Sequence, residues 1–463
     1  MIDKLMQKIE HASLLKISFV LCLIGFLLYV RMLGNNFALG DDKYQIQVNA
    51  LIKHVNTIPQ LFLGSTVYDP SGKELNGVYY KPLMETAFAL IYVVFKLNPF
   101  GYHLFDLVFH LINTILLFVF LRKLFALQKM QHEQVLSFFI SLIFLIHPAN
   151  VESVAFIAST QELLYMFFLF ITMLVSLRFL EKSSKKLLII ITVSTFASLL
   201  SKEAGVVALI VSPLAAYLYN RSKTIALFLA NATGFLLYIL LRLGIAHVPF
   251  DTKIPEPIMM ASLPQRLITI PYELYTYIRL IFFPKDLYIW YLWVVRSISD
   301  TRFVLLLPFD LLIIGFFVLF LFKLKSKLYI FFFIWAMVGF GIVSNIFPID
   351  ATIAERWVYG PLIGVLGMLA LIAAAWIKKS HQAKVWLLLI LVIFLPFFAI
   401  RSYVRIGDWK DTLTLFGHDE QYHQDSSIYY YHYGLFLKDA GKTDMAQQML
   451  IRYIYNAHMY GPQ

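Results

Sequence analysis

The chain has 463 residues, of which 60% are hydrophobic and 14% are charged, with a formal net charge of +11. Soluble domains carry about 25% charged residues, so this composition excludes an ordinary soluble domain and indicates a polytopic membrane protein. The positive charge is typical of Lys and Arg in cytoplasmic loops. No basic run alternates with aromatic residues in a soluble segment, so we expect no nucleic-acid partner.

The N-terminal sequence resembles a signal peptide in its order of a basic stretch followed by the apolar run "ISFVLCLIGFLLYV". It lacks a small-residue cleavage site, so we expect an uncleaved first membrane span. The single cysteine, Cys22, lies inside this run. No intrachain disulfide is therefore expected.

Apolar runs long enough to cross roughly 30 Å of hydrocarbon begin near Leu14, His103, Val135, Leu163, Leu187, Ala204, Thr224, Phe303, Leu328, Trp357 and Val385. The basic linkers between them are "RKLFALQKMQHEQ", "RFLEKSSKK", "NRSK", "KLKSK" and "KKSHQAK". The positive-inside rule places these linkers in the cytoplasm. The sequence thus predicts an all-α membrane bundle of about eleven spans over residues 1–401. The alternating linkers and the C-terminus then lie outside.

Two outer loops, 34–102 and 244–302, are long enough to carry structure of their own. The first holds the adjacent aspartates and an apolar patch, "YYKPLMETAFALIYVVFKLNPFG", which predicts an interfacial or re-entrant helix. The second holds "PQRLITIPYELYTYIRLIFFP", from Pro264 to Pro284, which is apolar but carries two arginines and a glutamate. A span there would turn the later basic loops outward, so we expect a helix along the outer interface.

Residues 402–463 form a polar and aromatic tail. Its sequence predicts a helix, a turn at Gly441 and a second helix. Gly434, Leu437, Ala446 and Leu450 fit the spacing of one tetratricopeptide unit. A single unit cannot bury its own apolar face, so we expect it to dock on the membrane domain or to remain from a longer array.

Ionisable residues gather at the outer ends of the expected spans. Such groups are costly at a bilayer unless they are paired or line an aqueous cavity, so the set predicts a shared polar cavity. Each residue alone is also compatible with a solvated or snorkelling side chain. The set comprises Asp41, Asp42, Lys81, Glu85, His147, Glu152, Glu162, Lys202, Glu203, Arg242, Glu355, Arg356 and Arg401.

Three local patterns sharpen this expectation. Lys202 and Glu203 lie in a hairpin with almost no loop between its two apolar runs. They could form a salt bridge that closes the hairpin, or Glu203 could orient Lys202 toward an anion. Arg356 begins a span, where its planar fork suits a phosphate, although capping is an alternative. His147 precedes a proline, and no second His or Cys lies at ligand spacing, so zinc is weakly supported.

A series of short motifs occurs in one order along the chain. They are "FALGDDKYQIQVN", "VYYKPL", "YHLFDLVFHLINTILLF", "HPANVESVAFI", "ELLY", "SKEAG", "AERWVYGP" and "DWKDTLTLF". Together they resemble the transmembrane and tetratricopeptide-repeat O-mannosyltransferases, which have the GT-C glycosyltransferase fold. The resemblance covers most of the chain.

The resemblance implies a membrane glycosyltransferase with an extracytoplasmic site. Its donor is a polyprenyl- or dolichyl-phosphate-linked sugar, expected to be mannose or a similar hexose. Its acceptor is a hydroxyl of a protein, expected to be Ser or Thr, or of a glycan, and transfer proceeds with inversion. Asp41 and Asp42 match the acidic motif that supplies the base, and Lys202, Arg356 and Arg242 match basic residues that hold the lipid phosphate. Such enzymes require no metal cofactor, although adjacent carboxylates could hold a divalent ion.

Elementary chemistry agrees with this reading. Transfer from a phosphate carrier needs a base for the attacking hydroxyl and positive charge for the departing phosphate. Of the two aspartates we favour Asp42 as the base, because it lies further from the span. The alternative function is a transporter or flippase of a lipid-linked or anionic substrate, which would favour mid-membrane charges and two matching halves. Either protein is multi-pass, in a bacterial inner membrane or the ER membrane.

Overall fold

The computed structural model describes residues 2–66, 79–250, 256–378 and 380–460. These residues form α-helices joined by short 3₁₀ and π turns, and within them the strand-like pairing is an isolated antiparallel bridge between Tyr291 and Ile353. The helices are α1 (Ile2–Glu10), α2 (Leu14–Tyr29), α3 (Leu39–Asp42), α4 (Pro82–Phe95), α5 (Pro99–Ala126), α6 (Glu133–Ile146), α7 (Val151–Ala155), α8 (Thr160–Glu181), α9 (Lys185–Ser201), α10 (Ala208–Tyr219), α11 (Thr224–Ile239), α12 (Pro257–Met260), α13 (Leu263–Phe282), α14 (Thr301–Leu324), α15 (Lys327–Ile342), α16 (Pro361–Ile377), α17 (His381–Asp408), α18 (Thr412–Asp419), α19 (Ser427–Asp439) and α20 (Thr443–Tyr460).

Several helices are long and apolar enough to cross a membrane, which indicates an integral membrane protein. Within the described residues there are six such spans, and a seventh if α6 and the helix after His147, bent by 56°, are counted together. The six are Leu14–Gly34, Pro99–Ala126, Ile157–Glu181, Arg221–Ile245, Thr301–Leu324 and Gln382–Asp408. The expectation of an all-helical membrane bundle is confirmed. The count of about eleven stays a prediction, because α9, α10, α15 and α16 are each shorter than 18 residues.

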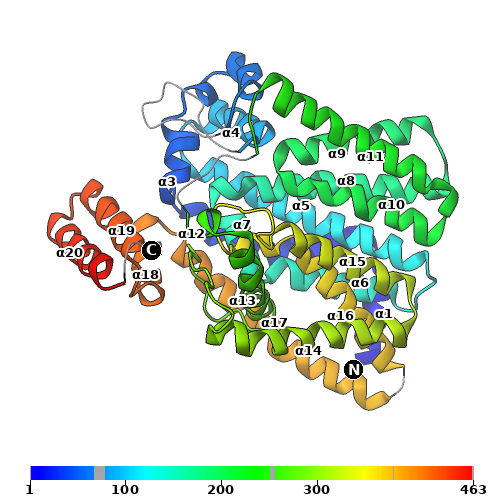
Figure 1. The fold of residues 1–463 in the computed structure, drawn as a ribbon. Coiled ribbons are helices and arrows are strands. Elements are labelled where there is room, and N and C mark those ends of the chain that lie inside the picture. The colour runs from blue at the N-terminus through cyan, green and yellow to red at the C-terminus, as the bar shows by residue number, and fades with distance from the viewer. Residues whose placement is uncertain (1, 67–78, 251–255, 379, 461–463) are drawn as a thin grey trace.

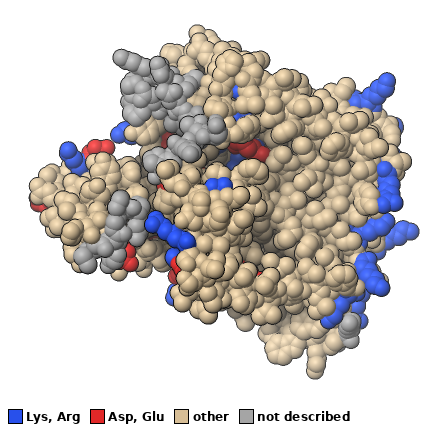
Figure 2. Space-filling view, viewed as in Figure 1, with Lys and Arg blue, Asp and Glu red and all other residues tan. Residues whose placement is uncertain are grey.

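The two ends of the bundle differ in charge. In Figure 1 the long helices run side by side, and the tail helices α18 to α20 lie beyond one end of them. Figure 2 shows Lys and Arg side chains gathered at the opposite end. The exposed Lys182, Lys185, Arg221, Lys325 and Lys327 belong to the loops expected to be cytoplasmic. Basic loops and tail therefore lie at opposite ends, as the charge sorting of the linkers predicts.

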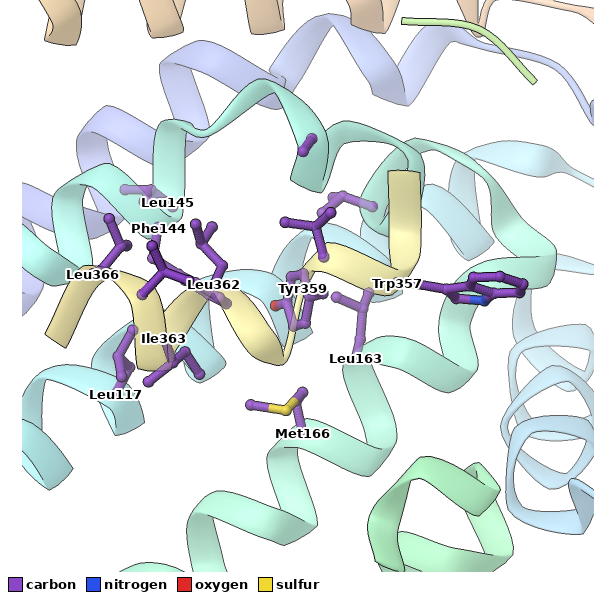
Figure 3. Packing of buried hydrophobic residues seen from close by; sticks show 14 of the residues in the cluster. Leu117, Phe144, Leu145, Leu163, Met166, Trp357, Tyr359, Leu362, Ile363 and Leu366 are labelled. Carbon is purple, nitrogen blue, oxygen red and sulfur yellow. The ribbon is translucent and has the colours of Figure 1, made fainter. Parts of the chain in front are cut away.

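The interior of the bundle is packed around α16. Figure 3 shows Leu362, Ile363 and Leu366 of this helix against side chains from α5, α6 and α8. Gly364 lies so close to α15 that an added Cβ would be 2.6 Å from the backbone nitrogen of Ala336. Small residues permit such close helix approach in membrane proteins, so α15 and α16 form a rigid pair that positions the loop between them.

Helix α13 lies across the same end of the bundle as the tail. Ser262 and Gln265 form a capping box at its start. Its carbonyl at Ile281 hydrogen-bonds to Nε2 of His147, 2.9 Å away at the end of α6. Asn345, just beyond α15, donates to Glu273 at 3.0 Å. The C-terminal half of α13 thus contacts the ends of α6 and α15, and the interfacial placement of this helix stays a prediction.

The tail is a helical hairpin docked on the membrane domain. Gly441, with a left-handed φ of +74°, makes the turn between α19 and α20. Asp419 of α18 accepts a 2.7 Å hydrogen bond from the backbone of Ile289 and lies 3.5 Å from Arg405 of α17, a fully buried arginine. Because breaking a buried ion pair is costly, this contact fixes α18, which leads into the hairpin, on the membrane domain. Its assignment as a tetratricopeptide unit stays a prediction.

Candidate active site

The adjacent aspartates have different surroundings. Asp42 is fully buried, and its two carboxylate oxygens accept hydrogen bonds from the backbone N–H groups of Ala38 at 2.7 Å and Ala158 at 2.9 Å. Burial raises the pKa of Asp42, and these two donors act in the opposite direction. The side chain thereby ties the first outer loop to the segment that precedes α8.

Asp41 remains accessible to solvent, although protein surrounds it closely enough that desolvation raises the pKa of its carboxyl. The charges of Arg356 and Lys81 lower this pKa, and the charge of Asp350 raises it. Asp41 is therefore a solvent-accessible carboxylate near charges from two other segments of the chain, one at Lys81 and one holding Asp350 and Arg356. We call this site the recess. Figure 2 shows a hollow in the surface of the molecule, with acidic and basic side chains visible in it.

A strained turn presents the two aspartates. Leu39, at the start of α3, has a left-handed φ of 62°, which is uncommon for a residue with a side chain. Its N–H donates to the hydroxyl of Thr412, the first residue of α18, at 3.0 Å. The tail therefore holds the turn, and such strain is often found at functional sites.

Lys81 enters the recess from the start of α4, where Pro82 occupies the first helical position. Its ammonium lies 4.0 Å from the ring centre of Tyr79. Desolvation lowers the pKa of Lys81, while the charges of Glu203 and Asp350 raise it. Glu85, one turn further along α4, is fully buried and lies 3.5 Å from the amide of Asn49.

Lys202 forms a buried ion pair with Glu162 of α8. The sequence predicts Glu203 as the partner of Lys202, and this prediction is wrong. Lys202 follows α9 with extended backbone, and Glu203 begins the next 3₁₀ turn (Glu203–Val207). Their side chains therefore reach different neighbours. Beside the pair is a small cavity, whose lining includes Trp335 and Trp357.

Arg356 forms a second ion pair, with Glu152 of α7. One carboxylate oxygen of Glu152 accepts from the guanidinium of Arg356, and the other accepts from its backbone N–H at 2.9 Å. The segment leading to Arg356 is held by two hydrogen bonds at Thr352, to Tyr291 and Trp293. Burial by itself would lower the pKa of Arg356, but the charges of Glu152 and Asp350 outweigh it and raise the pKa above its ordinary value, so the guanidinium stays charged.

Arg242 serves a different purpose from the other two cations. Its guanidinium donates to Glu203 at 2.7 Å, to the hydroxyl of Tyr238 at 2.7 Å, and to the carbonyls of Val248 and Pro249 at 3.1 Å. With these donors engaged, Arg242 orients Glu203, which in turn acts on Lys81.

Two predicted cavity residues have other partners. His147 is buried, with Nε2 on the carbonyl of Ile281 and Nδ1 accepting from the N–H of Ala149 at 3.2 Å, so it caps a turn. Glu355 pairs with Arg405 at 3.1 Å, and neither side chain is exposed. Glu355 thus secures the residue beside Arg356, away from the solvent-filled recess.

Asp350 was missed by the sequence reasoning. It acts on the pKa values of Asp41, Lys81 and Arg356, and it accepts a hydrogen bond from Tyr79. Asp350 stands in the segment "PIDATIAER", six residues before Arg356, and an acidic residue so close to that arginine was the available signal. The described residues hold no group of three or more His, Cys, Asp and Glu side chains arranged to bind a metal ion.

The chain is similar in sequence to several curated proteins, though it matches no protein-family profile. It is 24% identical over 455 residues to Protein O-mannosyl-transferase F38B6.6 of Caenorhabditis elegans, covering 93% of this chain and 61% of that protein. It is 24% identical over 417 residues to Protein O-mannosyl-transferase TMTC3 of Homo sapiens, covering 81% and 44%. The chain thus spans less than two thirds of the length of these relatives.

One solved structure is distantly similar. ArnT from Cupriavidus metallidurans, crystallised with undecaprenyl phosphate, is 12% identical, with a TM-score of 0.44 over 90% of this chain and 80% of that one. The sequence matches are the more informative comparison. They confirm that this chain is similar, over most of its length, to the O-mannosyl-transferases that its ordered motifs resemble.

Proposed function

We propose that this protein is a membrane glycosyltransferase that moves a sugar from a polyprenyl-phosphate carrier to an acceptor hydroxyl. One observation carries the proposal: an accessible carboxylate, Asp41, shares a recess with Lys81 and Arg356 at one end of a membrane bundle. A base and cations in one water-accessible site are what this reaction needs. The names of the relatives support mannose as the sugar and a protein as the acceptor.

The geometry supports Asp41 rather than Asp42 as the base. Both oxygens of Asp42 are engaged by backbone N–H groups, so it has little capacity left to accept a proton from a substrate. Asp41 is accessible, and its raised pKa lies closer to neutral pH than that of an ordinary aspartate, which favours general-base catalysis. Asp42 then acts as the positioning residue that fixes the turn.

Arg356, Lys202 and Lys81 are the proposed phosphate ligands. Arg356 and Lys202 are each held by one carboxylate, and both keep part of their side chain exposed. An incoming phosphate would add a second anion to each cation, in charge-assisted hydrogen bonds. Arg242 supports this group indirectly, because its donors are engaged by Glu203, Tyr238 and two carbonyls.

The proposed reaction balances as follows. The acceptor hydroxyl oxygen forms a bond to the anomeric carbon while the bond from that carbon to the phosphate oxygen breaks. The bonding electron pair leaves with the phosphate, whose negative charge faces Arg356 and Lys202. Asp41 takes the hydroxyl proton. Attack opposite the leaving group inverts the anomeric centre, and the carrier departs as polyprenyl phosphate.

The proposed site faces the extracytoplasmic side of the membrane, together with the tail. The basic loops at the other end of the bundle support this orientation. The hosting membrane is proposed to be a bacterial inner membrane, or the ER membrane in a eukaryote. A lipid carrier can reach such a site sideways from the bilayer, while a soluble acceptor arrives from the aqueous side.

Purified protein incubated with a panel of polyprenyl-phosphate sugars and Ser/Thr-rich peptides tests the proposal. We expect mass spectrometry to detect a hexose on the peptide and free polyprenyl phosphate as the second product. Movement of an intact lipid-linked sugar across vesicles, without its consumption, would instead support the transporter. If every donor stays intact and in place, the proposed function is wrong.

A further inference from the structure

An apolar cavity lies beneath α13, away from the charged recess. It has a volume of about 220 Å³ and is lined by residues of α13, α14, α15 and α16. Its lining includes Ile314 of α14, Phe333 of α15 and Met368 of α16, together with Ser344 just beyond α15. A cavity with such walls does not hold ordered water well, so hydrocarbon is the occupant that its surface favours.

Two polar groups in this apolar cavity lack a partner. Glu273 and Tyr277 are each 2% exposed and lie one helical turn apart on the cavity-facing side of α13. Oε1 of Glu273 accepts from Asn345, but its Oε2 has no hydrogen-bond partner, and neither has the Tyr277 hydroxyl. Leaving a buried polar group without a hydrogen bond is costly, so these groups indicate a polar ligand atom in the occupied site.

Tyr277 lines the cavity and also lies near the candidate active site. Tyr277 is close enough to Arg356, Glu152 and Glu162 that their charges act on its hydroxyl. These are members of the two ion pairs that hold the proposed phosphate ligands. A molecule with its charged group at Arg356 could therefore place the adjoining part of its chain beside Tyr277, which lines the apolar cavity.

The protonation state of Glu273 favours the binding of an anion beside it. Burial raises the pKa of Glu273 to about 8, so the carboxyl is mainly protonated at neutral pH. A neutral carboxyl donates a hydrogen bond to an anion without repelling it. The cavity thus offers two neutral donors, Glu273 and Tyr277, within a lining that otherwise provides mainly hydrocarbon contacts.

We propose that this cavity binds the first part of the hydrocarbon chain of the lipid carrier, with Glu273 and Tyr277 contacting the carrier beside its phosphate. The inference rests on the proposed function and adds to it the route by which the carrier leaves the bilayer, under α13. It also assigns two positioning residues that the sequence motifs did not include.

The test uses sugar-free carriers of two lengths, a long-chain polyprenyl phosphate and an isoprenyl phosphate of two units, bound to purified full-length protein. Ile314→Trp fills the cavity, whereas Leu312→Trp, at a position on the same helix that is 73% exposed, is the matched control. We expect Ile314→Trp to weaken long-chain binding at least about tenfold, since each buried methylene contributes about 0.8 kcal/mol. Short-chain binding should change far less, and Leu312→Trp should leave both unchanged.

The polar pair is tested separately. Tyr277→Phe should weaken binding of both carriers about two- to tenfold, the range expected for one lost hydrogen bond. Glu273→Gln, which keeps a neutral donor, should bind nearly as the wild type does, whereas Glu273→Leu should not. Equal losses with both carriers in Ile314→Trp, or no loss in folded protein, would overturn the inference.

Two further outcomes separate this inference from the proposed function. If phosphatidic acid binds as tightly as polyprenyl phosphate and shows the same Ile314→Trp effect, the cavity holds ordinary phospholipid and the inference is wrong. If polyprenyl phosphate binds in the chain-length-dependent manner expected but no donor transfers its sugar, the inference stands and the proposed function fails.

Discussion

Glu152 holds Arg356 by both its guanidinium and its backbone N–H. The carboxylate is nearly buried, while the arginine keeps part of its side chain exposed to the recess. Glu152 therefore holds Arg356 in place, and the exposed part of the guanidinium side chain can still bind a second anion.

Arg356→Gln should weaken binding of a polyprenyl-phosphate donor by about 10- to 150-fold, because hydrogen bonds to charged groups contribute about 1.5–3 kcal/mol. Donor affinity, measured by titration of purified protein, checks this. Arg296→Gln, on an exposed arginine of the neighbouring outer loop, is the matched control and should bind normally. Equal affinities in the two variants would remove Arg356 from the donor site.

The buried pair of Lys202 and Glu162 predicts a pattern of stability. Removing one partner of a buried ion pair costs about 3–5 kcal/mol, whereas replacing both with apolar residues can be neutral. Lys202→Met and Glu162→Leu should therefore each melt well below the wild type, and the double variant should recover most of the loss. Thermal unfolding in detergent measures this.

The exposed pair of Arg302 and Asp300 provides the comparison for those melts. Surface pairs contribute about 0–1 kcal/mol, so Arg302→Gln, which leaves the Asp300 cap of α14 in place, should change the melting temperature little. Additive losses in the double Lys202→Met, Glu162→Leu variant would show that the two side chains are not coupled.

Much of this arrangement could be predicted from the sequence, for a physical reason. Hydropathy marks helices along the chain, and charges at their ends must be paired or hydrated, so the residues of the recess were identifiable. The ion-pair partners could not be predicted. Lys202 pairs with Glu162, forty residues away, and not with its neighbour Glu203, because the spacing of residues in the sequence does not give the direction of the backbone at a turn. Asp350 was missed because it stands in a loop, and its approach to Asp41 depends on the bridge at Tyr291.

Transfer activity should fall at both low and high pH, which gives a pH profile with an acid limb and an alkaline limb. The raised pKa of Asp41 means that the base is protonated, and activity lost, at a higher pH than for an ordinary aspartate of pKa about 3.9. The lowered pKa of Lys81 means that donor binding is lost on the alkaline side below the ordinary lysine value of about 10.4. A profile of kcat/KM against pH shows both limbs.

Lys81→Arg identifies the alkaline limb. Arginine stays charged throughout, so the fall at high pH should move upward or vanish while the acid limb stays in place. An unchanged alkaline limb in this variant would assign that limb to another group.

Cysteine labelling can determine the orientation of the bundle. In a Cys22→Ser background, which has no other cysteine, one cysteine is placed at the exposed Gln448 of the tail and another, in a separate variant, at the exposed Lys325. A membrane-impermeant reagent should label intact cells only at position 448. Labelling only at position 325 would show that the topology is the reverse of the predicted one.

The central claim, that Asp41 is the general base of a sugar transfer, is tested most directly by comparing Asp41→Asn with Asp42→Asn in purified protein. Turnover of a polyprenyl-phosphate sugar and affinity for that donor are measured for both. General-base catalysis contributes about 10²–10⁴-fold, so Asp41→Asn should lose that much turnover and keep donor affinity within a few fold. Asp42→Asn should lose less turnover and more stability, because its carboxylate holds two backbone N–H groups. Near-full turnover in Asp41→Asn would contradict the account.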